Sequence, residues 1–152
     1  MRKLLPLVLL FPFVLFGCNK KPHEEENNTT YKEPIYQEVE DLHIEFKDLF
    51  NQKEDKYYAY FYFVTCSWCS YLRPQITEIA KSGNPTIYFV FPSEELPYTD
   101  DLDLALSSQG KDKLEDVYLY STPCLIEITN KIITMYTRDY YEIENFLNSV
   151  GK

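Results

Sequence analysis

Residues 57–81 of this 152-residue chain read YYAYFYFVTCSWCSYLRPQITEIAK, and this stretch decides the fold. Residues 56–65 are aromatic and β-branched and alternate tyrosine with other apolar side chains, which is typical of a strand buried on both faces. A helix is predicted to begin near Cys66 and to end before Gly83, since glycine suits a helix C-terminal cap. Cys66 and Cys69 therefore lie where a buried strand passes into a helix.

That position gives the two cysteines different chemistry. The unpaired backbone N–H groups and the macrodipole at a helix N-terminus favour an anion, so they lower the pKa of Cys66 and populate its thiolate. Helical spacing puts Cys69 on one apolar stripe with Leu72, Ile76 and Ile79, so its sulfur is expected to be shielded. We predict that Cys66 is the nucleophile and that Cys69 is the resolving thiol, which releases a mixed disulfide.

Periodicity predicts further elements on both sides of this stretch. Apolar residues at helical spacing indicate an amphipathic helix over residues 39–50. TIYFVF at 86–91 has no polar face and predicts a second buried strand. Residues 100–116 have a helical but irregular pattern.

The C-terminal third indicates a hairpin followed by a helix. Residues 124–129 and 132–137 are predicted strands joined by a turn at Asn130-Lys131. Asp139 is a predicted helix cap, with Glu142 three residues later. The order α-β-α-β-α-β-β-α predicts an α/β sandwich whose first two strands are parallel and which ends in an antiparallel hairpin.

The sequence resembles the thioredoxin superfamily in three features. These are the strand–CxxC–helix unit at 57–81, Pro74 five residues after the second cysteine, and Thr122-Pro123 at the start of a strand. The likeness covers about residues 39–150. It implies a three-layer α/β/α sandwich with a mixed central sheet and thiol–disulfide oxidoreductase activity that needs no cofactor. It also implies that Thr122 and Pro123 belong to the active site and that Pro123 is cis.

Two departures from that pattern bear on activity. Many thioredoxins carry a buried acid six residues before the first cysteine, where this chain has Tyr60, and a tryptophan just before that cysteine, where it has Thr65. Both changes speak against a fast, general thioredoxin-type reductase. Glu127 is the single charge in an apolar strand and either supplies the missing proton acceptor or faces water.

Other residues near the motif have two interpretations each. Trp68, between the cysteines, and Tyr71 either form an apolar lip that binds an unfolded substrate or are ordinary surface aromatics. Cys124, directly after Pro123, is either a buried thiol in the core or a third redox partner.

The CxxC pair itself has two alternative explanations. It is compatible with a structural disulfide in an extracytoplasmic protein. It is also compatible with half of a zinc site, for which Cys124 and His43 would complete four ligands. Because there is no second CxxC and His43 is expected to be solvated on the polar side of a different helix, we predict no metal site.

The N-terminus predicts export and lipidation. Residues 1–17 have a basic head followed by an apolar run too short and proline-broken to span a membrane, as in a signal peptide. Leu15-Phe16-Gly17-Cys18 resembles the lipobox of bacterial lipoproteins, which implies acylation of Cys18 with chains such as palmitate. Ordinary cleavage that leaves Cys18 as a free thiol is the alternative. Residues 18–38 are polar and predict a flexible tether, and 39–152 form the domain.

Charge and compartment limit the partners. Loss of Arg2 and Lys3 with the signal peptide takes the formal net charge from −9 to −11, which argues against binding to nucleic acid or to anionic lipid. Attachment to the outer face of the cell membrane is then expected from the acyl chains. We expect a monomeric thiol–disulfide oxidoreductase that acts on exported cysteine-containing proteins and exchanges electrons with a redox partner. The alternative is a non-catalytic thioredoxin-like accessory module that binds an exported peptide or transporter.

Overall fold

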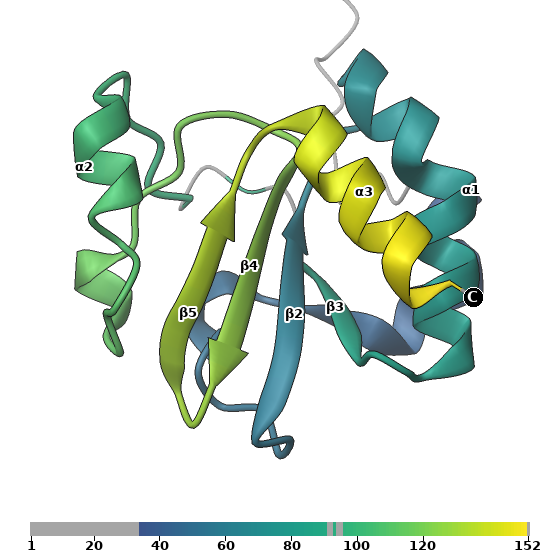
Figure 1. Ribbon diagram of the computed structural model, residues 1–152, viewed down its shortest axis with the longest axis horizontal. Helices are drawn as coiled ribbons and strands as arrows, with labels where there is room; N and C mark the ends of the chain where they lie inside the picture. The colour runs from purple at the N-terminus through teal and green to yellow at the C-terminus, as the bar shows by residue number, and fades with distance from the viewer. Residues whose placement is uncertain (1–33, 91–92, 94–95, 152) are drawn as a thin grey trace, which may run out of the picture. The chain divides into compact units, whose positions relative to one another are not determined.

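A single mixed β-sheet organises the domain (Figure 1). The computed structural model describes residues 34–90, 93 and 96–151. Its strands are β1 (His43–Ile44), β2 (Lys56–Phe61), β3 (Ile87–Val90), β4 (Cys124–Thr129) and β5 (Ile132–Thr137). They lie in the order β1-β3-β2-β4-β5. The first three strands run parallel, and β4 and β5 continue the sheet as an antiparallel hairpin.

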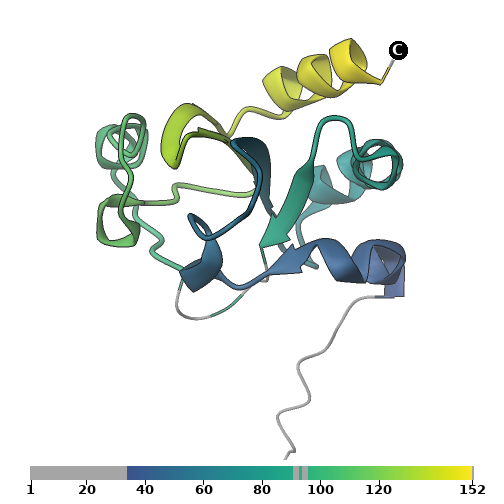
Figure 2. The same ribbon diagram turned by 90° about the horizontal axis from the view of Figure 1, so that it is seen from below.

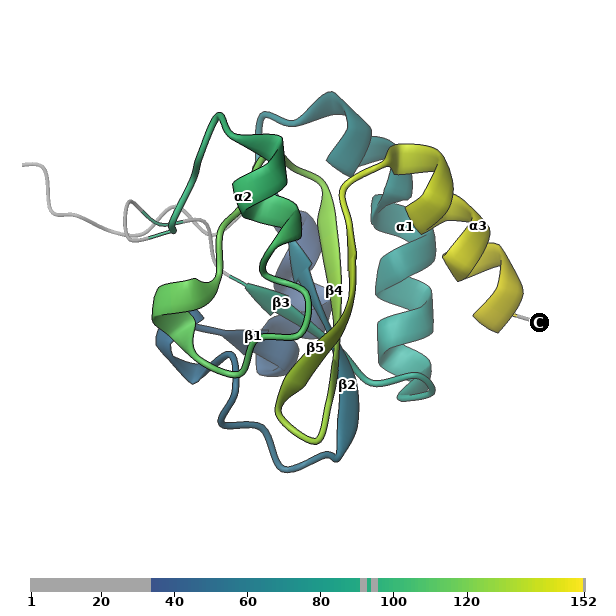
Figure 3. The same cartoon turned by 60° about the vertical axis from the view of Figure 1, so that its left-hand side comes forward.

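Helices cover both faces of this sheet (Figures 2 and 3). One face packs against α1 (Ser67–Ser82) and α3 (Tyr140–Val150), and the other against α2 (Leu102–Leu106) and the irregular segments around it. Two clusters of buried apolar side chains, one on each face, form the core. The structure therefore has the predicted three-layer α/β/α architecture, a thioredoxin-like fold.

Most element predictions are confirmed. The helix α1 ends where Gly83 adopts the left-handed conformation, with φ of 73°, and Asp139 caps α3 by accepting hydrogen bonds from the backbone N–H groups of Tyr141 and Glu142. The predicted hairpin at 124–137 forms with a turn at Asn130-Lys131, both at positive φ. The irregular region at 100–116 contains α2 and a short 3-10 helix at Leu114–Asp116.

The predicted helix over residues 39–50 is wrong. The chain instead forms two short 3-10 segments within Pro34–Leu42, separated by a kink at Val39, followed by the edge strand β1 and a further 3-10 turn at Phe46–Asp48. Val39 packs on the α1 face of the sheet, whereas Leu49 packs on the opposite face. The apolar residues at helical spacing therefore pack on opposite faces of the sheet, because the chain crosses the edge of the sheet between them.

The start of the domain also differs from the prediction. The predicted tether reached residue 38, but Pro34–Leu42 is helical and Tyr36 is buried. The predicted signal peptide at 1–17 and the predicted acylation site Cys18 lie outside the described residues. Within residues 34–90, 93 and 96–151, no helix has the length and apolarity needed to cross a membrane.

Candidate active site

The two cysteines stand at the N-terminus of α1, just beyond the carboxyl end of β2. Cys66 caps the helix, and its Sγ accepts a hydrogen bond from the backbone N–H of Cys69 at 3.1 Å. The Cα atoms are 5.2 Å apart, and the two residues form a disulfide. An extended backbone at Cys66 turns the chain into the helix and points this sulfur at the free N–H groups. That contact favours a negative sulfur at Cys66.

Burial separates the two sulfurs as the helical pattern predicted. Cys69 is completely buried, together with Leu72 and Ile76 on the same face of α1, whereas Cys66 is half-buried. A thiol at Cys66 is therefore the one that a large substrate reaches, and Cys69 reaches only the sulfur of Cys66. The roles of nucleophile and resolving thiol stay predictions that this geometry favours.

The loop before β4 completes the site. The Thr122-Pro123 peptide bond is cis, as the resemblance implied, and the carbonyl oxygen of Thr122 lies 3.4 Å from the Sγ of Cys66. When Cys66 is a thiol, its S–H donates to this carbonyl. Residues 56 positions apart in the chain thus meet at one sulfur.

Two side chains hold this loop at Tyr120. The hydroxyl of Tyr136, on β5, accepts a hydrogen bond from the backbone N–H of Tyr120 at 3.2 Å. The guanidinium of Arg138 lies over the Tyr120 ring, 4.7 Å from its centroid. Sequence reasoning did not single out Tyr136 or Arg138, because both contacts depend on how β5 pairs with β4.

Aromatic side chains gather where the first turn of α1 meets the first turn of α3. Trp68 and Tyr71 from α1 meet Tyr140 and Tyr141 from α3, with successive ring centroids 5.0 to 6.0 Å apart. Trp68, Tyr71 and Tyr141 are 52%, 70% and 64% exposed, which is unusual for such large rings. We call these four residues the aromatic surface. The sequence prediction included its α1 half and missed the half that α3 contributes.

The position of the missing acid is occupied by a buried phenol. Tyr60 is completely buried, and burial raises its pKa well above the ordinary value. It therefore stays a neutral phenol that already holds its proton, and it does not supply the base that a carboxylate would supply. Its ring stacks on Tyr62, whose hydroxyl lies 3.0 Å from His43 Nε2. The prediction that His43 is solvated is wrong, since its other ring nitrogen lies 3.0 Å from the carbonyl oxygen of Val39.

Glu127 makes its contacts near the start of β2, at the end of the strand away from the cysteines. Its carboxylate accepts hydrogen bonds from Tyr58 at 2.6 Å and Thr134 at 2.7 Å and pairs with Lys56 at 2.9 Å. Burial alone would raise the pKa of this carboxyl, but the three donors outweigh it and hold the pKa below its usual range. These contacts give Glu127 a role in the sheet and not in proton transfer at Cys69.

Cys124 is enclosed in the core. It is 0% exposed and pairs with Phe61 across β2 and β4. Burial raises the pKa of its thiol to about 12, so the neutral form predominates. The structure favours a buried core thiol over a third redox partner. Among the described residues, no group of three or more His, Cys, Asp or Glu side chains is placed to hold a metal ion.

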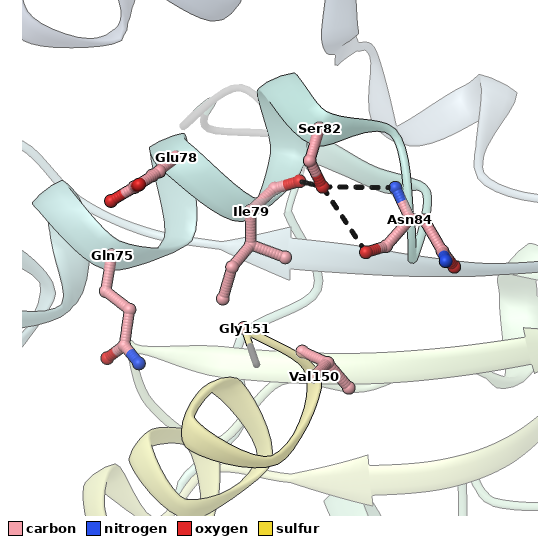
Figure 4. Close-up of a pocket in the computed structure, with 7 residues that line it drawn as sticks. All are labelled: Gln75, Glu78, Ile79, Ser82, Asn84, Val150 and Gly151. Atoms are coloured by element: carbon pink, nitrogen blue, oxygen red, sulfur yellow. Dashed lines mark hydrogen bonds between the residues drawn. The ribbon is translucent and has the colours of Figure 1, made fainter.

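The surface also has a hollow (Figure 4). It is formed by the last turns of α1 and α3 and is lined by Gln75, Glu78, Ile79, Ser82, Asn84, Val150 and Gly151. Gln75, the lining residue nearest the N-terminus of α1, lies nine positions after Cys66, roughly 14 Å along the helix, and neither Cys66 nor Cys69 lines the hollow.

Fold and site together define a thioredoxin-like protein with a close CxxC pair. Solved structures similar to this chain include thioredoxin f2 from Chlamydomonas reinhardtii, with 11% identity and a TM-score of 0.47 over 70% of this chain and 93% of that one. Mitochondrial thioredoxin 3 from Saccharomyces cerevisiae is 17% identical, with a TM-score of 0.41 over 68% and 86%. An uncharacterised thioredoxin-like protein from Clostridium perfringens is 19% identical, with a TM-score of 0.38 over 72% and 81%.

These similarities concern the fold and not the substrate. No protein-family model matches the sequence, and no curated protein matches it.

Proposed function

We propose that this protein is a membrane-anchored, extracytoplasmic thiol–disulfide oxidoreductase that acts on exported proteins through Cys66 and Cys69. The observation that carries the proposal is the asymmetry of the pair. Cys66 is reachable and receives a helix N-terminal N–H at 3.1 Å, whereas Cys69 is completely buried behind it. A purely structural disulfide has no need of one sulfur placed to react and a second placed to resolve.

The reaction follows from that arrangement. With the pair reduced, the Cys66 thiolate attacks one sulfur of a substrate disulfide, and the other substrate sulfur leaves as a thiolate and takes a proton from solvent. Cys69 gives its proton to solvent and attacks the Cys66 sulfur, and the second substrate sulfur leaves as a thiolate that takes a proton from solvent. The substrate gains two electrons and two protons, and the Cys66–Cys69 disulfide forms. The reverse sequence oxidises a substrate dithiol.

Substrate contact is assigned to the surface around Cys66. A polypeptide joined to this sulfur meets the Thr122-Pro123 loop on one side, since the Thr122 carbonyl is 3.4 Å away. On the other side it meets Trp68 and the rest of the aromatic surface. Exposed aromatic rings bind apolar segments of unfolded chains, which is the form in which exported proteins acquire disulfides.

Trapping of mixed disulfides tests the proposal. Cys69→Ser removes the resolving thiol, so Cys66-linked partners are expected to accumulate in the cell envelope and to disappear on reduction. The double variant Cys66→Ser, Cys69→Ser is the matched control and is expected to trap none. If Cys69→Ser traps no partner and Cys66→Ser has no phenotype, the protein is not an oxidoreductase, and the accessory-module alternative is favoured.

A further inference from the structure

A phenol oxygen anchors one end of the loop that carries Pro123. The Tyr136 hydroxyl accepts the backbone N–H of Tyr120 at 3.2 Å. Tyr120 lies two residues before the cis peptide bond between Thr122 and Pro123. Tyr136 is only 7% exposed and pairs with Ile126 within the β4–β5 hairpin, so the oxygen has a fixed position.

The middle of this loop is the part that faces the reactive sulfur. The Thr122 carbonyl lies 3.4 Å from Cys66 Sγ, opposite the Cys69 N–H at 3.1 Å. These two groups have opposite effects on the ionisation of Cys66. The Cys69 N–H stabilises the thiolate, whereas the Thr122 carbonyl oxygen repels the thiolate and accepts a hydrogen bond from the neutral thiol. The distance of the Thr122 carbonyl therefore affects how readily Cys66 ionises.

We propose that Tyr136 is a positioning residue, whose hydroxyl anchors the Tyr120 end of loop 120–124 and so holds the Thr122 carbonyl against Cys66. The role rests on the proposed function, since it adjusts the sulfur that performs the exchange. Tyr136 does not touch the substrate or either sulfur of the pair. It acts on Cys66 through the loop.

Tyr136→Phe tests this role, because it removes one oxygen atom and keeps the ring in place. The rate of Cys66 alkylation by iodoacetamide is measured on the reduced full chain between pH 5 and 9, with the modified peptide identified by mass spectrometry. With the loop released, the carbonyl moves away, so the profile shifts to lower pH. The rate at pH 6 is expected to rise about threefold, the scale of one weak hydrogen bond.

The neighbouring thiol of Cys124 and the neighbouring phenols do not titrate between pH 5 and 9, so the pH profile of alkylation reports the ionisation of Cys66. Cys69 and Cys124 are completely buried, and burial raises the pKa of Cys124 to about 12. Burial also raises the pKa of Tyr98 and Tyr136 above the ordinary value, so neither phenol titrates in this range.

Tyr57→Phe is the matched control. Tyr57 is 1% exposed, and its hydroxyl donates to the Leu49 carbonyl at 2.7 Å on the far side of the sheet from α1, so it loses a comparable hydrogen bond away from the loop. Its alkylation profile is expected to match the unmodified protein. Hydrogen exchange at the Tyr120 amide is a second readout and is expected to accelerate only in Tyr136→Phe.

The outcomes separate this inference from the proposed function. Coincident profiles and equal Tyr120 exchange in both variants would overturn the role of Tyr136, even if Cys66 still traps partners. An equal shift in Tyr57→Phe would overturn it as well, since the effect would then be general. A shift confined to Tyr136→Phe supports the role, and it does so even where trapping with Cys69→Ser fails.

Discussion

At the scale of single residues, the environment of each sulfur decides its chemistry. Cys66, Cys69 and Cys124 lie within one region of the fold, yet only Cys66 is partly exposed. The helix N-terminus favours charge on Cys66, while the apolar core keeps Cys124 neutral. The reactivity of each of these thiols is therefore expected to depend on its position in the fold.

This difference predicts the labelling pattern of the reduced protein. At pH 8 iodoacetamide is expected to modify Cys66 quickly and to leave Cys124 intact until the protein unfolds in urea. The folded thiol of Cys124 titrates at about 12, above its unfolded value of about 8.5, so its neutral form stabilises the fold below about pH 8.5 and this contribution is lost as pH rises toward 12. Peptide-resolved mass spectrometry measures both sites. Rapid labelling of Cys124 without urea would contradict its enclosure.

At the scale of secondary-structure elements, Glu127 links three strands. Its carboxylate contacts Lys56 and Tyr58 on β2 and Thr134 on β5, while the residue itself lies on β4. These donors stabilise the charged form of the carboxylate. The contacts that Glu127 makes with β2 and β5 are therefore expected to weaken when acid protonates it.

Glu127→Gln is expected to lower the free energy of unfolding by about 1 to 2 kcal/mol at neutral pH, because charge-assisted hydrogen bonds are replaced by weaker ones. The folded pKa is lowered, so the stabilisation is complete above the unfolded value of about 4.3 and is lost as pH falls through the folded pKa. Urea unfolding at pH 7 and pH 3 measures the difference, which should shrink at pH 3. Glu115→Gln, at an exposed position, is the control and should change neither value.

The same scale explains what the sequence could and could not predict. The strand, CxxC and helix at 56–82 follow from a continuous apolar run and a regular helical stripe, and these patterns are local. The segment at 39–50 failed because its apolar residues are divided between two faces of the sheet. The contact between Tyr136 and Tyr120 arises from strand register, which no local pattern encodes.

At the scale of the whole molecule, the site lies at one end of the sheet. The carboxyl end of β2, the N-terminus of α1 and the loop before β4 meet there, while the hollow of Figure 4 lies along the C-terminal half of α1. Neither Cys66 nor Cys69 lines that hollow.

Membrane attachment is predicted to be separable from this chemistry. Cys18→Ser is expected to shift the protein from the membrane fraction to the soluble extracytoplasmic fraction and to abolish labelling with palmitate, because acyl chains supply the attachment. Alkylation of Cys66 should be unchanged, since the described residues of the site, from Cys66 to Tyr141, do not include Cys18. Cell fractionation and radiolabelling measure the two effects. Retention of Cys18→Ser in the membrane fraction would contradict lipid anchoring.

The enclosure of Cys124 fixes the stoichiometry of the described domain. With only Cys66 and Cys69 able to exchange, each molecule holds one pair of electrons to give or to accept. An oxidoreductase built in this way exchanges one substrate bond and then needs an external thiol or disulfide to restore its starting state. Withholding that reagent is expected to limit the proposed activity to a single turnover.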